Sequence, residues 1–216
     1  MALITALKRN KGKVDIFLDG EMAFSLSASL ASAEGLTQGR ELTREEVNAL
    51  LKRDRLQHGL NTAARYLSLR PRSDAELRSK LQSHGYDTTT QNLVIEALRT
   101  KGLLDDNAFA AYWTENRDSF SPRSRSLTRI ELQKKGVAKD VIEQAVGGID
   151  DDASAYRAAS SHVRSMRWSS QEQFRRRLGG YLERRGFGYS VINATLKKIW
   201  QEVASENISD TGHPDF

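Results

Sequence analysis

The fold is decided by a stretch that occurs twice, PRSDAELRSKLQSHGY at residues 71–86 and PRSRSLTRIELQKKGV at residues 122–137. Each stretch starts with Pro-Arg-Ser and reaches a glycine 14 residues after the proline. A third glycine, Gly186, follows 50 residues later, and hydrophobic residues stand four residues before and directly after all three glycines. This pattern is typical of a helix that ends at a glycine of positive φ and is followed by a residue that folds back onto the last turn. A period of about 50 residues predicts tandem repeats of one supersecondary unit.

We expect three units of three helices each, because N-capping residues recur at matching places between the glycines. The expected helices lie near 54–69, 73–84 and 90–101, then 106–118, 124–135 and 139–146, then 152–166, 170–185 and 190–204. The expected domains are an N-terminal β-hairpin region and lead-in at 1–41, a capping helix (about 42–53) with the first repeat at 42–104, the second repeat at 105–149, a third, basic repeat at 150–204 and a disordered acidic tail at 205–216. Units of this size bury their own faces poorly, so we expect them to stack into a curved array.

The N-terminal residues 1–26 have the pattern of strands. Asp19-Gly20 separates two apolar runs and favours a two-residue hairpin turn, and the lysine-rich stretch at 8–13 is expected to form the preceding turn. Thr43 and Glu46 have the spacing of a capping box, which marks the start of a helix. The fold class is therefore mainly α, with three tandem three-helix repeats preceded by a small antiparallel β element.

The composition excludes several functional classes. The chain has 216 residues, a net charge of +5 and no cysteine, so it forms no disulfides and uses no thiolate chemistry. Its apolar runs are too short for a membrane span or a secretion signal, which favours a cytoplasmic location. Nucleotide-binding loops, zinc-hydrolase motifs and nucleophile elbows are absent, so we expect no enzymatic activity, cofactor or metal. An enzyme remains only as a hydrolase without known motifs, and the sequence pairs no nucleophile with a base.

Acidic pairs recur at the start of the second and third repeats. Asp105-Asp106 and Asp150-Asp151 each follow an apolar residue and precede a predicted helix. Paired carboxylates can bind a metal ion, but aspartate at the start of a helix more often caps it. We therefore expect these residues to cap helices.

Positive charge is concentrated in the third repeat. Residues 153–200 contain ten Lys or Arg and two Asp or Glu, whereas residues 201–216 contain four acidic and no basic residues. Such polarity is expected of a protein with a polyanionic or acidic partner, and a solvated basic face is the alternative. Arginine forks bind phosphate or carboxylate groups. The candidate residues for partner or DNA binding are Arg70, Arg72, Arg123, Arg125, Arg175, Arg176, Arg177, Arg184 and Arg185.

Two structural alternatives stay open at this point. Arg72 and Arg123 occupy the same place in two repeats, where they could bond the carbonyl groups at the end of a helix. Trp168 and Tyr181 could stack on nucleobases, but burial in the core is the usual place for such residues.

An ordered set of fragments also carries a family resemblance. The fragments are Tyr66-Leu67-Ser68-Leu69-Arg70-Pro71-Arg72-Ser73 with Glu76-Leu77, Gly102-Leu103-Leu104-Asp105-Asp106, Glu131-Leu132-Gln133-Lys134-Lys135-Gly136-Val137, and Phe174-Arg175-Arg176-Arg177-Leu178 with Arg184-Arg185-Gly186-Phe187. In order and spacing they resemble the RecX family of RecA regulators, over residues 3–204. The sequence departs from the family pattern at 121–124, where a glycine-containing turn is more usual, and at 139–146, where the helix is short and lacks an aromatic residue.

The resemblance implies a bacterial cytoplasmic protein that is not an enzyme. Members of the family bind the RecA filament on single-stranded DNA and modulate its recombinase, ATPase and coprotease activities, usually by inhibition. This implies a part in DNA recombination, repair and the SOS response, with RecA and single-stranded DNA as partners and no membrane. The oligomeric state stays open, and a monomer is the simplest form for a protein that decorates a filament. The competing interpretation is a stand-alone helical DNA-binding protein whose third repeat acts as a helix-turn-helix.

Overall fold

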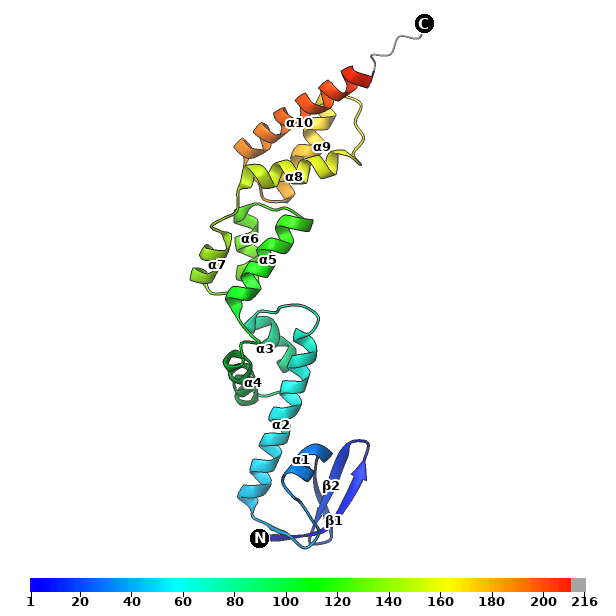
Figure 1. The fold of residues 1–216 in the computed structure, drawn as a ribbon, viewed down its shortest axis with the longest axis vertical. Helices are drawn as coiled ribbons and strands as arrows, with labels where there is room; N and C mark the ends of the chain where they lie inside the picture. Colours follow the sequence, from blue (N-terminus) through cyan, green and yellow to red (C-terminus); the bar gives the residue numbers. More distant parts are fainter. Residues whose placement is uncertain (211–216) are drawn as a thin grey trace. The chain divides into compact units, whose positions relative to one another are not determined.

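A computed structural model describes the backbone of residues 1–210 and the side chains of residues 1–205 (Figure 1). The described residues form four strands and ten helices, with the strands confined to the N-terminal part of the chain. The chain divides into two compact units. The first contains Met1–Arg70 and Leu77–Leu103, and the second contains Pro71–Glu76 and the residues from Leu104 onward. The predicted class, mainly helical with a small antiparallel sheet, is confirmed.

The four strands form one antiparallel sheet in the first unit. They are β1 Ala2–Asn10, β2 Lys13–Leu18, β3 Glu21–Ser27 and β4 Glu41–Leu42, in the order β3-β2-β1-β4. Asp19 and Gly20 have φ values of 49° and 92°, so the predicted hairpin turn is confirmed. The turn expected at 8–13 is reduced to Lys11-Gly12, because β1 continues to Asn10. The pattern did not reveal β4, whose two residues pair with the start of β1.

A single long helix replaces two predicted ones. The helix α2 spans Arg44–Leu67, whereas we expected one helix over 42–53 and another over 54–69. Its start is as predicted, because the Thr43 hydroxyl accepts from the Glu46 amide and the Glu46 carboxylate accepts from the Thr43 amide. Asp54, a typical helix-starting residue, lies mid-helix, where its carboxylate accepts hydrogen bonds from the amide and hydroxyl of Ser27 at 2.9 and 2.6 Å. It therefore ties α2 to the end of the sheet.

The other predicted helices occur with ends displaced by a few residues. After the short α1 (Ala28–Ala33), α3 (Asp74–Ser83) and α4 (Thr88–Thr100) follow α2, then α5 (Asp106–Phe120), α6 (Arg125–Lys134) and α7 (Lys139–Val146), then α8 (Asp151–Val163), α9 (Gln171–Arg184) and α10 (Tyr189–Asp210). The helix α10 ends six residues beyond its expected end at 204. Residues 205–210 of the tail that we expected to be disordered continue α10, and its residues 211–216 lie outside the described residues.

The three glycines of the repeat end their helices in the same way. Gly85, Gly136 and Gly186 have φ values of 77°, 75° and 84°. The amide that follows each glycine donates to the carbonyl five residues earlier, at 3.2 to 3.3 Å, in the pairs Tyr86 to Leu81, Val137 to Leu132 and Phe187 to Leu182. This is the bonding of a Schellman motif, in which only glycine adopts the positive φ without strain.

Each repeat of the second unit has its own apolar core. Phe109, Leu132 and Val146 are fully buried among α5, α6 and α7. Phe174 and Leu178 are fully buried among α8, α9 and α10. The second and third repeats are therefore separate packing units. Within the part of the chain that the structure describes, no helix is both long and apolar enough to cross a membrane.

Candidate functional site

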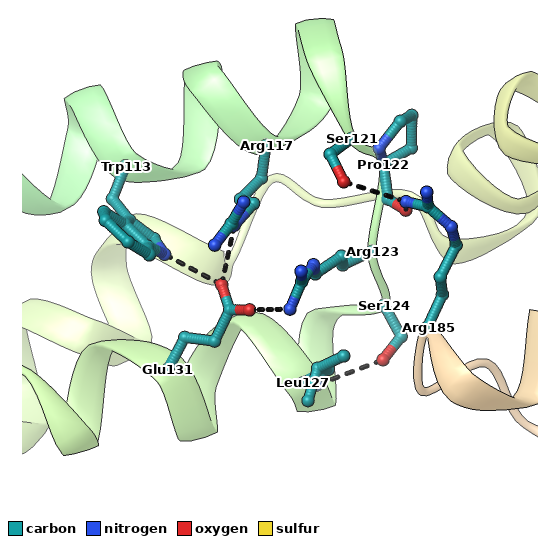
Figure 2. Close-up of polar contacts among 9 residues, drawn as sticks. All are labelled: Trp113, Arg117, Ser121, Pro122, Arg123, Ser124, Leu127, Glu131 and Arg185. Atoms are coloured by element: carbon teal, nitrogen blue, oxygen red, sulfur yellow. Dashed lines mark hydrogen bonds and ion pairs between the residues drawn. The ribbon is translucent and has the colours of Figure 1, made fainter.

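The turn Pro122-Arg123-Ser124 meets the glycine turn of the third repeat. The Ser124 amide donates to the Arg185 carbonyl at 3.0 Å. Figure 2 shows the Arg185 side chain reaching back, where it donates to the Ser121 hydroxyl at 3.0 Å and to the Pro122 carbonyl at 2.9 Å. A Cβ at Gly186 would stand 2.6 Å from Ser124 Oγ. The glycine is thus required by its φ and by the close approach of the two turns. We call the contact between a Pro-Arg-Ser turn and the glycine turn of the following repeat the repeat joint.

The same contact occurs around the first Pro-Arg-Ser turn. Within the second unit, the Ser73 hydroxyl donates to the Lys135 carbonyl at 2.7 Å and accepts from the Glu76 amide at 3.1 Å. A Cβ at Gly136 would stand 2.4 Å from Ala75 Cβ. The Pro-Arg-Ser turn is therefore a seat for the glycine turn of the following repeat, a role that the sequence pattern did not reveal.

The acidic pairs add a second recurring contact to the joint. Asp150 caps its own helix, as predicted, by accepting from the amides of Asp152 and Ala153. Its neighbour Asp151 accepts from the Arg125 amide at 2.7 Å, so it caps α6 of the preceding repeat. The first pair does the same. Asp105 accepts from the Asn107 amide at 2.8 Å and Asp106 accepts from the Asp74 amide at 2.9 Å. Each pair thus caps two helices.

Arg123 is held inside the second repeat by Glu131. Figure 2 shows the Glu131 carboxylate accepting from Trp113 Nε1 at 2.9 Å, from Arg117 Nε at 2.8 Å and from Arg123 Nη1. Burial lowers the pKa of Arg123, although the Glu131 carboxylate opposes this effect, and Arg117 and Arg185 lower it further. Arg123 therefore binds a carboxylate rather than the helix-end carbonyls considered from the sequence.

The structure separates the candidate arginines into two groups. Arg123 and Arg185 are half-buried in the contacts just described, and Arg125 donates through Nε and Nη2 to the Ile149 carbonyl. Arg70 and Arg72 are also half-buried, beside the first Pro-Arg-Ser turn. The exposed candidates on α9 are Arg175, Arg176, Arg177 and Arg184. Arg125 is exposed as well, but it binds the Ile149 carbonyl, so the second group consists of the four arginines of α9.

Three of the exposed arginines line a basic hollow between α8 and α9. The hollow has a volume of about 560 Å³, and its lining consists of His162, Ser165, Met166, Arg167, Arg176, Arg177 and Arg184. Arg177 Nη1 donates to the Arg167 carbonyl at 2.6 Å, which orders one wall. Arg175 lies outside the hollow, with Nη2 at 3.4 Å from Asn193 Oδ1. The described residues of the lining include no carboxylate, so the cations there are not neutralised locally.

His162 is partly buried at this hollow, beside the arginines. Its imidazole ring stacks on the Tyr181 ring, with centroids 3.8 Å apart and planes inclined by 2°. Burial lowers the pKa of His162 first, and the guanidinium groups of Arg185 and Arg184 lower it further. The imidazole is therefore harder to protonate than a histidine in water.

The two aromatic residues that are candidates for base stacking are partly buried and pack against the core of the third repeat. Trp168 packs edge-on against Phe174, with ring centroids 5.3 Å apart. Tyr181 carries His162 on its ring and has the Arg185 guanidinium 4.5 Å from its centroid. These contacts favour the core interpretation. Among the described residues, no cluster of His, Cys, Asp or Glu could hold a metal ion.

Comparison with known proteins identifies the repeats. Residues 60–98 match the family model described as "RecX, first three-helix domain", and residues 105–146 match "RecX, second three-helix domain". The chain is 30% identical over 206 residues to "Regulatory protein RecX" of Clostridium botulinum (strain Alaska E43 / Type E3), covering 92% of this chain and 96% of that protein. It is also 30% identical over 208 residues to "Regulatory protein RecX" of Lactobacillus delbrueckii subsp. bulgaricus, covering 94% and 77% of the two chains.

Solved structures show the same fold. "Crystal structure of regulatory protein RecX" matches with a TM-score of 0.63 and 22% identity, covering 89% of this chain and 98% of that chain. "Crystal structure of RecX from Lactobacillus salivarius" matches with a TM-score of 0.56 and 22% identity, covering 67% and 96%. The family resemblance inferred from the ordered fragments is confirmed by the curated relatives, and the chain belongs to the RecX family of regulatory proteins.

Proposed function

We propose that this protein regulates the RecA recombinase by binding the RecA filament on single-stranded DNA, and that it inhibits the recombinase, ATPase and coprotease activities of RecA. Membership of the RecX family supports RecA as the partner. The observation that supports a charged contact is the basic hollow, whose four arginines have no carboxylate among the described lining residues. Arginine forks bind phosphates and carboxylates, and a nucleoprotein filament offers both.

The proposed mechanism is binding without catalysis. By contacting neighbouring RecA protomers and the DNA between them, the protein would freeze or cap the filament instead of competing for ATP. This action needs no cofactor. A monomer in the cytoplasm is the simplest form that could decorate a filament, and its place would be in DNA recombination, repair and the SOS response.

The test is hydrolysis of ATP by the cognate RecA on single-stranded DNA, titrated with this protein at two salt concentrations. Inhibition at less than one molecule per RecA protomer, weaker at high salt, is the expected result. The triple variant Arg176→Ala, Arg177→Ala, Arg184→Ala should inhibit less, whereas Arg175→Ala on the same helix is the control. Unchanged inhibition by the triple variant would exclude the basic face as the cause.

A second outcome would favour the stand-alone DNA-binding protein. In that case the protein would bind a duplex sequence-specifically and leave RecA activity unchanged. A helix-turn-helix reads base edges in the major groove, so its affinity would depend on the duplex sequence. The charged contact that we propose for the arginines of α9 does not require readout of base edges.

A further inference from the structure

The basic hollow includes the positions that, in the first two repeats, contact the glycine turn of the following repeat. Counted back from the glycine of each repeat, Arg176 and Arg177 correspond to Ala75 and Glu76 in the first repeat. Ala75 lies against Gly136, and the Glu76 carboxylate binds Lys135 Nζ at 2.5 Å. The face that serves as a joint in the first repeat is therefore an arginine-lined hollow in the third.

This change of residues selects against another repeat as the ligand. The glycine turns that fill the joints carry a cation directly before the glycine, Lys135 in one and Arg185 in the other. A further turn of this kind would meet Arg176 and Arg177 in place of an acidic or neutral face, and like charges repel. The hollow is therefore suited to an anion.

The number of guanidinium groups favours phosphates over a single carboxylate. Within this protein the Glu131 carboxylate contacts two arginines, Arg117 and Arg123, and the Glu143 carboxylate accepts from one, Arg129. The hollow holds four arginines, which exceeds the need of one carboxylate. Successive phosphates of a nucleic-acid strand present several acceptor oxygens at close spacing, and arginine forks match them.

The lining of the hollow also indicates which part of the nucleic acid it contacts. No Phe, Tyr or Trp side chain is among the described residues that line the hollow. Single-strand binding that involves bases depends on stacking against such rings, whereas backbone contacts carry no sequence information. We propose that the hollow lined by Arg167, Arg176, Arg177 and Arg184 is a phosphate-binding site that holds the backbone of single-stranded DNA independently of the bases.

This inference rests on the proposed function, because it names the part of the nucleoprotein partner that the third repeat contacts. The test uses the full chain without RecA and measures fluorescence anisotropy with labelled strands of equal length. The strands are oligothymidylate, an abasic phosphodiester strand, and oligothymidylate with a neutral methylphosphonate backbone. The protein should bind the first two with similar affinity and should not bind the third.

Matched variants locate the site on α9. Arg176→Ala and Arg184→Ala should each weaken binding about tenfold and lower the salt slope by about 0.7, the value for one lost phosphate contact on a single strand. Arg175→Ala removes the same charge from the same helix outside the hollow, so it should cost less than about threefold. Circular dichroism of each variant checks that α9 is intact.

Each opposite result would overturn the inference. An equal loss in Arg175→Ala would show a diffuse charge effect, and binding of the methylphosphonate strand would show that phosphate is not the ligand. Displacement of the DNA by polyglutamate at an equal charge concentration would show a site for acidic protein segments. Failure to bind any strand, together with inhibition of RecA, would reject the phosphate site and leave the proposed function standing.

Discussion

Replacement of Gly186 by alanine tests the repeat joint, and Gly85→Ala is its matched control. Both glycines end a helix with nearly equal φ, 84° and 77°. A Cβ at Gly85 would meet no atom within 4 Å. A Cβ at Gly186 would stand 2.6 Å from Ser124 Oγ and 2.7 Å from Leu127 Cβ. The two variants therefore share the cost of a positive φ and differ in the contact between repeats.

The expected loss of stability follows from these two contributions. A left-handed conformation costs a residue other than glycine about 1–2 kcal/mol, which is the whole expected effect of Gly85→Ala. Overpacking adds about 1–3 kcal/mol, so Gly186→Ala should lose about 2–5 kcal/mol. Leu127 Cβ belongs to the rigid start of α6, so this contact cannot be relieved by rotation of a side chain.

Urea unfolding followed by circular dichroism measures the loss in each variant. Hydrogen exchange then locates it, because the Ser124 amide donates across the joint to the Arg185 carbonyl at 3.0 Å. The exchange rate of that amide should rise in Gly186→Ala and should stay unchanged in Gly85→Ala. Equal losses in the two variants, or full protection of the Ser124 amide in Gly186→Ala, would refute the role of the joint.

Three further changes test separate parts of the structure. Glu131→Gln leaves Arg117 and Arg123 without their carboxylate and should destabilise the second repeat by about 1–3 kcal/mol in urea unfolding; an unchanged midpoint would contradict it. Since the pKa of His162 is lowered in the folded protein, stability should fall as the pH drops from about 6.5 through that lower pKa. His162→Phe should remove this part of the acid sensitivity, and an identical pH profile would argue against it. Gly180→Ala adds a Cβ 3.5 Å from a guanidinium nitrogen, an ordinary contact, and should raise stability by about 0.5–1 kcal/mol; a loss would show strain at that position.

The parts of the fold that could be predicted are those encoded by neighbouring residues. The helix ends at Gly85, Gly136 and Gly186 depend on one φ angle and one backbone bond, so the glycine spacing located them. The capping box of Thr43 and Glu46 is equally local. The residues that form these helix ends and caps are separated by only a few positions, so their spacing in the sequence is enough to predict them.

The parts that could not be predicted depend on partners far away in the sequence. The sequence predicts a helix that starts near residue 54, but the Asp54 carboxylate binds Ser27, 27 residues earlier, and α2 runs through Asp54. The sequence makes Arg185 a candidate for partner or DNA binding, but its side chain binds Ser121, 64 residues earlier. Composition cannot separate an arginine that holds two turns together from one that faces solvent.

Alignment of the repeats supplies part of the missing signal for the candidate site. An arginine that recurs at the same place in two repeats serves the architecture they share, as Arg123 does in the turn that seats the next repeat. Arg176 and Arg177 have no basic counterpart, because the corresponding residues are Ser126 and Leu127 in the second repeat. Two adjacent cations at the face that elsewhere packs against a neighbour would oppose such packing. The charge of that face is therefore explained by an external anion, and the unrepeated arginines are the ones to test for binding.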